Sequence, residues 1–183
     1  AYSLCEAGKS IVLLEDGELA SGMTAVTTAH LSHVLDDRYT EIKKLHGEAT
    51  TRIVAQSHTA AINRIEAIVS GERIDCEFER VTGYLFEAPE QMGKNILRKE
   101  LDAARHAGIR DAIMIPRAPI EPFDTGPCIA FPNQAQFHPI KYLAGIARAI
   151  QRSGGKIFTK THVDQVKGGT DAHVRADKRT VRA

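Results

Sequence analysis

The pattern of apolar and polar positions predicts alternating helices and strands. Residues 1–7 carry apolar side chains at helical spacing and are followed by Gly8, which suits a helix that stops at a left-handed residue. Residues 10–15 (SIVLLE) form a continuous apolar run that ends in an acid, which is typical of a strand buried on both faces. A helix, a glycine and a buried strand in this order predict the second half of a βαβ unit, whose first half would precede Ala1.

The next segments predict a loop, a long helix and a hairpin. Residues 16–32 are rich in Gly, Ser, Thr and Ala, which indicates an extended loop with one short helix. Residues 76–87 alternate and then become apolar, which predicts a β-hairpin with Gly83 in a bulge or tight turn. Residues 39–70 have a helical period, and the apolar stripe of that helix is Ile53, Ala60, Ile62, Ile65 and Val69.

The remainder of the chain predicts two more helices separated by extended pieces. Residues 94–107 form an amphipathic pattern that stops at Gly108, and five prolines then divide residues 116–132 into short extended segments. A third helix spans residues 138–152, with Pro139 at a position where the missing N–H costs nothing and His138 as the N-terminal cap. Strands are expected at residues 156–159 and 161–166, a glycine turn at 168–169, and the beginning of a further hairpin at 173–176 and 180–183.

Composition narrows the class of protein. The chain has 183 residues, enough for one domain or parts of two, and its 43% hydrophobic and 26% charged residues are ordinary for a globular protein. A formal net charge of +1 gives no basic field for nucleic acid or anionic lipid. The longest apolar run, Ile11–Leu14, is too short to cross a bilayer. Neither nucleic acid nor a membrane is expected as a partner, and the oligomeric state stays open.

The potential metal ligands are scattered. Cys5, Cys76 and Cys128 are far apart and form no Cys-x-x-Cys pair, so we expect ordinary thiols in a reducing cytoplasm and neither a disulfide framework nor a cluster. His30 and His33 lie three apart, which would place them on one face of a helix, but no third ligand lies near them. No metal site is expected in this chain.

Glu15 carries the clearest candidate chemistry. It ends an apolar run at the point where, in a dinucleotide-binding βαβ unit, an acid accepts hydrogen bonds from both hydroxyls of the adenosine ribose. The glycine-rich phosphate loop of such a unit lies about twenty residues earlier, so here it would precede Ala1. The plainer interpretation is a solvated acid that begins the turn Glu15-Asp16-Gly17.

Small and hydroxyl-bearing residues follow Glu15 in two runs, residues 20–24 (ASGMT) and 27–32 (TTAHLS). Small residues let a backbone approach a flat ring closely, and hydroxyl and amide groups can donate hydrogen bonds to phosphate oxygens. An ordinary surface loop is the alternative interpretation.

These runs carry a resemblance. Residues 1–15, 20–24 and 27–32 resemble the N-terminal part of the D-amino acid oxidase-like superfamily of FAD-dependent oxidoreductases, which includes glycine and sarcosine oxidases. More narrowly, TTAHLS, FPNQAQFHPIKYLAGIARAI (131–150) and GGKIFTKTHVDQV (154–166) resemble bacterial members with a C-terminal Rieske iron–sulfur domain. The similarity runs over nearly the whole chain, and the order and spacing of the motifs match as well as their letters.

The resemblance implies roles for particular residues. Glu15 would bind the adenosine ribose, Ser21 and Thr24 would lie near the pyrophosphate, and Val163 would contact adenine through its backbone. The flavin ring and ribityl chain would lie along Thr28, Ala29, His30 and Leu31, with the His30 ring as a hydrogen-bond donor. No catalytic residue is assigned, because the neutral amine substrate is itself the reactive form.

The resemblance also implies a fold and an activity. The expected class is α/β: a partial Rossmann-like FAD-binding domain (residues 1–74 and 133–183, lacking its first strand and glycine loop) with an inserted α+β substrate domain (residues 75–132). The function would be FAD-dependent oxidation of a C–N bond in a small amine or amino acid, with a Rieske cluster possible outside this chain. The full-length protein would be the enzyme and this fragment alone inactive. The alternatives are a nicotinamide-dependent dehydrogenase fragment and a non-catalytic structural or interaction module.

Overall fold

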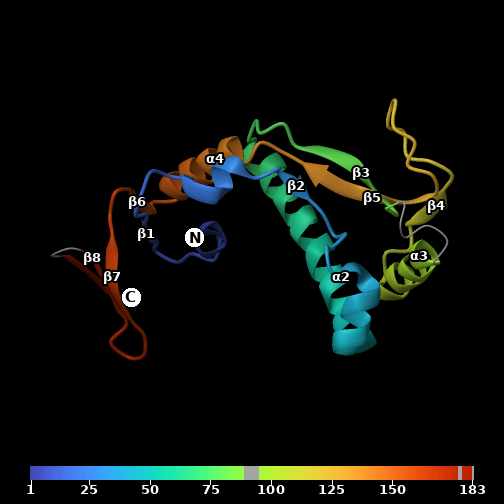
Figure 1. Ribbon diagram of the computed structural model, residues 1–183. Coiled ribbons are helices and arrows are strands. Elements are labelled where there is room, and N and C mark those ends of the chain that lie inside the picture. Colours follow the sequence, from blue (N-terminus) through green and yellow to red (C-terminus); the bar gives the residue numbers. More distant parts are fainter. Residues whose placement is uncertain (89–94, 177–178, 183) are drawn as a thin grey trace. The chain divides into compact units, whose positions relative to one another are not determined.

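The computed structural model describes residues 1–88, 95–176 and 179–182, which divide into two compact units (Figure 1). Unit 1 comprises Ala1–Thr28, Val69–Cys76 and His138–Ala183, and unit 2 comprises Ala29–Ile68 and Glu77–Phe137. Helices combine with one parallel pair of strands and two antiparallel sheets, so the predicted α/β class is confirmed. The assignment of 1–74 and 133–183 to a cofactor domain and of 75–132 to a substrate domain stays a prediction.

Unit 1 begins with the predicted helix, glycine and strand. Helix α1 (Tyr2–Glu6) ends before Gly8, whose φ of 73° lets Gly8 N–H bond to Cys5 O and Lys9 N–H to Leu4 O. Strand β1 (Val12–Leu14) pairs in parallel with β6 (Lys156–Phe158). The predicted burial of this strand on both faces is wrong, since Val12 is 41% exposed. Among the described residues, β6 is the one strand paired with β1, so the other edge of β1 has no neighbouring strand there.

Helix α4 (Pro139–Arg152) precedes β6 and has the predicted cap. The His138 Nδ1 atom accepts a hydrogen bond from Lys141 N–H at 3.4 Å, and Pro139 occupies the first turn. At Gly145 of this helix, a Cβ would stand only 2.5 Å from Ile74 Cγ2. Gly145 therefore allows α4 to approach the segment that follows α2.

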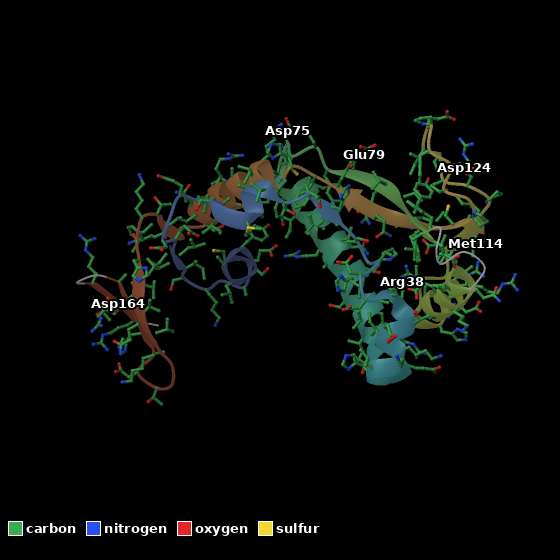
Figure 2. All side chains as sticks on the ribbon, in the orientation of Figure 1. Arg38, Asp75, Glu79, Met114, Asp124 and Asp164 are labelled. Atoms are coloured by element: carbon green, nitrogen blue, oxygen red, sulfur yellow. The ribbon has the colours of Figure 1, made fainter. Side chains whose placement is uncertain are left out.

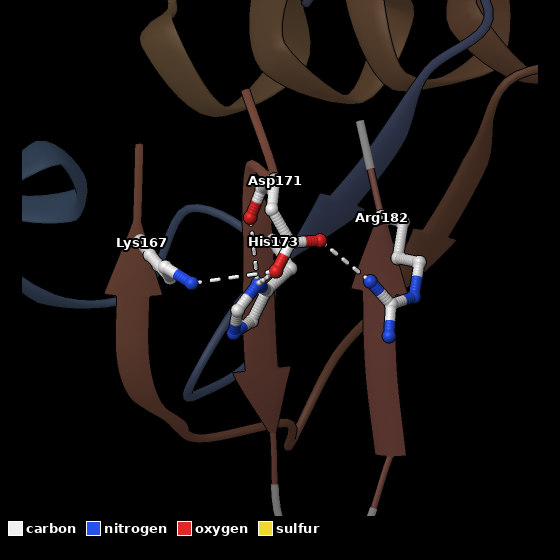
Figure 3. A network of polar contacts seen from close by, with 4 residues as sticks. All are labelled: Lys167, Asp171, His173 and Arg182. Carbon is white, nitrogen blue, oxygen red and sulfur yellow. Dashed lines mark hydrogen bonds and ion pairs between the residues drawn. The ribbon is translucent and has the colours of Figure 1, made fainter. Parts of the chain in front are cut away.

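The last part of unit 1 is a three-stranded antiparallel sheet. It is formed by β7 (Val163–Lys167), β8 (His173–Ala176) and β9 (Arg179–Arg182). Figure 3 shows the polar network at one turn of this sheet. The Asp171 carboxylate accepts hydrogen bonds from Lys167 Nζ at 3.3 Å and from an Arg182 guanidinium nitrogen at 2.7 Å. The His173 Nδ1 atom lies 2.9 Å from Asp171 O. The predicted strand and hairpin are confirmed.

Unit 2 is built on an antiparallel sheet around β5 (Cys128–Gln136). Strand β3 (Glu79–Phe86) pairs with one edge of β5, while β2 (His30–Leu31) and β4 (Ile113–Ile115) pair with opposite ends of its other edge. Met114 lies on β4, and Asp124 lies in the loop that leads from β4 to β5 (Figure 2).

Two predictions for this sheet are wrong. Residues 76–87 do not form a hairpin, because β3 is a single strand whose partner is β5; the predicted irregularity at Gly83 is confirmed by a register shift between Val81 and Gly83. Residues 128–136 are one strand despite Pro132. Pro132 and Asn133 (φ 64°) are the two residues of β5 at that register shift, where a single residue of β3 faces them. The bulge therefore lies in β5 and accommodates a residue that cannot donate to the ladder.

Two helices cover the sheet of unit 2. Helix α2 (Arg38–Glu72) is interrupted at Gly47 (φ 78°), and α3 (Ile96–Ala107) stops at Gly108 (φ 111°), as predicted. The predicted stripe of α2 is partly wrong, because Ile53 is 64% exposed and Ala60 is also exposed. Its buried positions are Tyr39, Ile42, Thr51, Ala55, Ile62 and Ile68. No helix in the described ranges is both long and apolar enough to span a bilayer.

A buried carboxylate joins these two helices. Glu100 of α3 is 1% exposed and accepts hydrogen bonds from Tyr39 N–H at 2.7 Å, Thr40 N–H at 3.0 Å and Thr40 Oγ1 at 2.8 Å. These donors belong to the first turn of α2, directly after Arg38, which Figure 2 labels. Glu100 thus satisfies amide groups that have no partner within their own helix and places a negative charge at the positive helix end.

Candidate functional site

The carboxyl ends of β1 and β6 bring two loops of unit 1 together. Glu15 N–H donates to Phe158 O at 2.9 Å, which extends the parallel pairing by one step. Beyond it, Thr161 N–H donates to Glu15 O at 2.9 Å and Lys160 N–H donates to Gly17 O at 3.0 Å. Ligands of open α/β sheets bind in the crevice outside the carboxyl ends of parallel strands, so this edge is the first candidate for a site.

Glu15 lies where the sequence predicts, one residue beyond β1. Its side chain is half-buried, and Oε1 accepts a hydrogen bond from Gly17 N–H at 3.2 Å. Backbone bonds on both its N–H and its C=O fix the residue between the two loops. An ionised carboxylate has about four acceptor positions, so it can still accept hydrogen bonds from the hydroxyls of a ligand.

One ion pair and one contact between an aspartate and a histidine cross between the same loops. Asp16 Oδ1 lies 3.1 Å from His162 Nδ1, and Glu18 Oε1 lies 2.8 Å from Lys160 Nζ. Asp16 is adjacent in sequence to Glu15, and His162 is adjacent to Val163, the half-buried first residue of β7. The two predicted adenosine contacts, Glu15 and Val163, are therefore each one residue away from a side chain that links the loops.

A cavity of about 480 Å³ lies beside these strand ends in unit 1. Leu14 and Phe158, the last residues of β1 and β6, contribute to one part of its wall, and the β8–β9 hairpin contributes to the other. The sequence pattern does not indicate the hairpin residues as part of a site, because only the register of β8 and β9 places them here. The lining consists of Leu14, Phe158, Thr161, Ala176, Arg179, Thr180 and Val181.

The Ser/Thr-rich run after Glu15 forms the predicted short helix, a 3-10 turn over Gly22–Val26. Ser21 is its N-terminal cap residue, and a Cβ added at Gly17 would lie 2.8 Å from Ser21 Oγ, so the loop folds back closely onto Gly17. Ser21, Thr24 and Thr28 are all exposed, as are the apolar side chains of Met23 (82%) and Val26 (73%). This stretch is accessible to a ligand.

The remaining predicted positions belong to unit 2. Ala29 has a φ of 63°, and its carbonyl accepts a hydrogen bond from Phe137 N–H at 3.4 Å. His30 is exposed and Leu31 half-buried, and both lie in β2. The predicted residues thus divide between the units: Glu15, Ser21, Thr24, Thr28 and Val163 lie in unit 1, and Ala29, His30 and Leu31 in unit 2.

A buried polar network anchors the segment after β2. The sequence pattern gives no indication of this network. The Gln134 Oε1 atom accepts hydrogen bonds from His33 N–H and Ser32 Oγ, both at 2.9 Å, and its Nε2 donates to Pro132 O at 2.9 Å. Gln134 Nε2 lies 2.6 Å from His33 Nε2, so that imidazole nitrogen is the acceptor and the proton is on Nδ1. Burial lowers the pKa of His33. The network fixes the chain just beyond His30.

The two histidines weighed as metal ligands are not arranged as such. His30 is exposed on a strand, whereas His33 is buried in the bend that follows, so the shared helical face considered for them does not exist. Within the part of the chain that the structure describes, no three His, Cys, Asp or Glu side chains are grouped to hold a metal ion.

Comparison with known proteins gives a family and two curated relatives. The family model described as "FAD dependent oxidoreductase" matches residues 1–183. A Bacillus subtilis (strain 168) protein named "Putative Rieske 2Fe-2S iron-sulfur protein YhfW" is 34% identical over 170 residues, which is 92% of this chain and 33% of that protein. The gamma-glutamylputrescine oxidoreductase of Escherichia coli (strain K12) is 26% identical over 188 residues, which is 100% of this chain and 43% of that protein.

Solved structures share the fold. Glycine oxidase from Geobacillus kaustophilus matches with a TM-score of 0.75 and 14% identity over 100% of this chain and 49% of that one. L-amino acid deaminase from Proteus myxofaciens matches with a TM-score of 0.73 and 14% identity over 98% of this chain and 39% of that one. The chain therefore spans between a third and half of the length of these relatives, and it has the mixed α/β fold of FAD-dependent amino acid oxidases.

Proposed function

The chain belongs to the family of FAD-dependent oxidoreductases, and from this premise we propose that unit 1 binds the adenosine part of FAD at the carboxyl ends of β1 and β6. The observation that carries the proposal is the position of Glu15: a half-buried carboxylate, fixed by backbone bonds on both sides, directly after a strand in a parallel pair. Two ribose hydroxyls are donors that such a carboxylate can bind together.

The residues present fit an adenosine group. Within the part of the chain that the structure describes, the Glu15 carboxylate accepts one hydrogen bond, from Gly17 N–H to Oε1. Most of its acceptor capacity therefore remains for the ribose. The neighbouring cavity of about 480 Å³ has apolar walls from Leu14, Phe158 and Val181, which suit a flat aromatic ring, and Thr161 and Thr180 add polar groups. In this proposal the Val163 backbone contacts adenine.

The other predicted residues complete the proposal. Exposed Ser21 and Thr24 offer hydroxyl and amide groups to the pyrophosphate, in a loop where Ala20 (φ 62°) and Gly22 (φ 79°) have left-handed backbone conformations. Thr28, Ala29, His30 and Leu31 stay the proposed neighbours of the ribityl chain and the flavin ring. The Gln134 network supports this role indirectly, because it holds the segment that follows His30.

For the full-length protein we propose oxidation of a C–N bond in a small amine or amino acid. Bound FAD supplies the hydride acceptor. The support comes from the names of similar proteins: an oxidoreductase of gamma-glutamylputrescine, a glycine oxidase and an L-amino acid deaminase. This chain contributes cofactor binding and part of a substrate domain, and none of its residues is assigned to the chemical step.

A Rieske cluster is a second proposal for the full-length protein, and it rests on the name of the Bacillus relative. In that case electrons leave through the iron–sulfur centre. The present sequence contains no Cys-x-His pair, so the ligands would have to lie outside it. Iron and sulfide analysis of the purified full-length protein tests this point, and an iron-free protein that retains full activity contradicts it.

The proposed function is tested by purification of the full-length protein, followed by anaerobic mixing with amino acids and amines. We expect a yellow protein whose flavin absorption band bleaches with at least one substrate of this class. A colourless protein that binds a nicotinamide dinucleotide in place of FAD would favour the dehydrogenase alternative. A protein that binds neither dinucleotide would favour a structural or interaction module.

A further inference from the structure

We propose that Gln134 is a positioning residue for flavin binding, because its buried side chain fixes the segment that contacts the flavin. This role rests on the proposed function, which places the ribityl chain and the ring along a run that includes residues 29–31, here called the flavin segment. Gln134 would act on the cofactor through its neighbours. The observation that carries the proposal is the pair of hydrogen bonds that Gln134 Oε1 accepts directly after the flavin segment, from Ser32 Oγ and from His33 N–H, both at 2.9 Å.

The flavin segment has little backbone pairing of its own. Strand β2 (His30–Leu31) has two residues, and they pair with residues 135–136 of β5. Just before it, the hydrogen bond from Phe137 N–H to Ala29 O is long, at 3.4 Å. A segment with so few hydrogen bonds opens easily unless the residues beside it are held firmly.

Gln134 holds those residues from within the core. It is 4% exposed, and its Nε2 atom donates to Pro132 O at 2.9 Å and lies 2.6 Å from His33 Nε2. The oxygen and the nitrogen of the amide therefore both have partners, which fixes the side chain in one orientation. A fixed amide in turn keeps Ser32 and His33 in place at the end of the flavin segment.

The neighbouring strand leaves room for this side chain. A Cβ added to Gly83 of β3 would stand 3.2 Å from Gln134 Cγ, which is tighter than an ordinary van der Waals contact. An alanine at this position would have to displace the Gln134 side chain slightly. Gly83→Ala therefore disturbs the position of Gln134 and leaves all of its polar groups present.

The consequence for binding follows from the hydrogen bonds. Removal of the Gln134 amide takes away the acceptor of two donors, one of them the buried His33 N–H, so the flavin segment loosens. Binding of a flavin must then order the segment as well as contact it, which weakens the affinity. The proposed adenosine contacts Glu15 and Val163 belong to unit 1, whereas the flavin segment belongs to unit 2. We therefore expect an effect on FAD but not on ADP, which has the adenosine and the pyrophosphate but no flavin.

The experiment compares the affinities of the FAD-depleted full-length protein for FAD and for ADP by titration calorimetry. Gln134→Met keeps the approximate size of the side chain and removes both polar groups. Ser32→Ala removes one of the two donors to Oε1, and Gly83→Ala crowds Gln134 Cγ. Gln136→Met is the matched control, because Gln136 lies on the same strand, is exposed, and donates its side-chain hydrogen bond to Glu79 at 3.1 Å. The melting temperature of each FAD-free variant is measured in parallel.

We expect Gln134→Met to weaken FAD binding by about five- to fiftyfold and to leave ADP binding within about twofold of the unaltered protein. Ser32→Ala and Gly83→Ala should weaken FAD binding by smaller factors and also spare ADP. Gln136→Met should bind both ligands as the unaltered protein does. Glu15→Gln, in contrast, should weaken both ligands, because both contain the ribose.

Unchanged FAD affinity in Gln134→Met overturns the positioning role and leaves the proposed function intact. An equal loss of FAD and ADP affinity also overturns it, because such a loss indicates general damage to the protein. Should Gln134→Met not fold, Ser32→Ala decides the question: a selective loss of FAD affinity supports the role, and unchanged affinity contradicts it. Failure of the unaltered protein to bind either ligand overturns the proposed function as well.

Discussion

The buried carboxylate of Glu100 offers the sharpest test of how unit 2 is held together. Glu100 lies on α3, is 1% exposed, and accepts three hydrogen bonds from the first turn of α2. The substitution Glu100→Gln keeps the size of the side chain but replaces one acceptor oxygen by an amino group. Only one oxygen then remains for the Tyr39 and Thr40 donors, and the negative charge at the helix terminus is lost.

The size of the effect follows from these contacts. A hydrogen bond to a charged group contributes about 1.5–3 kcal/mol, and an anion at a helix N-terminus contributes about 0.3–1 kcal/mol. The substitution removes the charge completely. In Glu100 one oxygen accepts the bond from Tyr39 and the other accepts both bonds from Thr40, so replacing either oxygen by an amino group removes at least one of the three bonds. Since such contributions are not additive, we expect Glu100→Gln to lower the free energy of opening of the α2 N-terminus by about 2–4 kcal/mol.

Native-state hydrogen exchange of the full-length protein measures this loss directly at the amides of Tyr39 and Thr40. A loss of about 2 kcal/mol raises their exchange rates by about thirtyfold when exchange follows local opening. Asp102→Asn is the control, because Asp102 is an exposed carboxylate on the same helix, and its effect should stay within about 0.5 kcal/mol. Equal exchange in the two variants would refute the capping role of Glu100.

Three further predictions concern stability. Gly145→Ala should destabilise unit 1 by about 1–3 kcal/mol in urea unfolding, because the new Cβ would meet Ile74 at 2.5 Å; Ile74→Val in the same chain should recover part of the loss. Arg80→Lys should cost about 1–2 kcal/mol, because lysine keeps the charge but lacks the planar fork that binds Glu66. Arg80→Met, which removes the charge as well, should cost at least as much, and full stability in Arg80→Lys would show that charge alone accounts for the interaction. Because burial lowers the pKa of His33, the unfolded chain binds the proton more tightly, so stability should fall as the pH drops below about 6.5; His33→Gln should flatten this dependence.

Local rules predicted a large part of the fold. Several confirmed features depend on neighbours within a few residues. They are the helix stops at Gly8 and Gly108, the cap at His138 and the short helix after Glu15. The helix, glycine and strand at the start indicated a βαβ unit, and its parallel partner β6 lies after α4. The helix ends, the cap and the short helix follow from constraints on the backbone of adjacent residues, whereas the pairing of β1 with β6 joins segments that are distant in sequence.

The errors come from partners that are distant in sequence. Residues 79–86 alternate as a strand does, but the choice between a hairpin and a strand paired with residues 128–136 depends on long-range contacts. Pro132 appeared to end a strand, and it is tolerated because it lies in a bulge of β5 itself, where two residues of β5 face one residue of β3. The exposure of Ile53 likewise follows from which face of α2 meets the sheet, and its helical period alone does not fix that choice.

The candidate site shows the same division. The position of Glu15 after its strand follows from a short motif, whereas the cavity beside it requires the hairpin that carries Arg179 and Thr180. Gln134 was missed because a glutamine within a strand carries no sequence signal for a buried network. Its role arises only when β5 brings it next to His33.

The central claim, that Glu15 holds the ribose of FAD, is tested most directly by titrating the FAD-depleted full-length protein with FAD in three forms: unaltered, Glu15→Gln and Glu41→Gln. Glu41 is an exposed glutamate on α2 in unit 2, so its variant controls for the loss of one negative charge. We predict that Glu15→Gln weakens FAD binding by about ten- to hundredfold, the equivalent of one or two charge-assisted hydrogen bonds, and that Glu41→Gln leaves it unchanged. Binding of FAD by Glu15→Gln with the affinity of the unaltered protein would contradict the account.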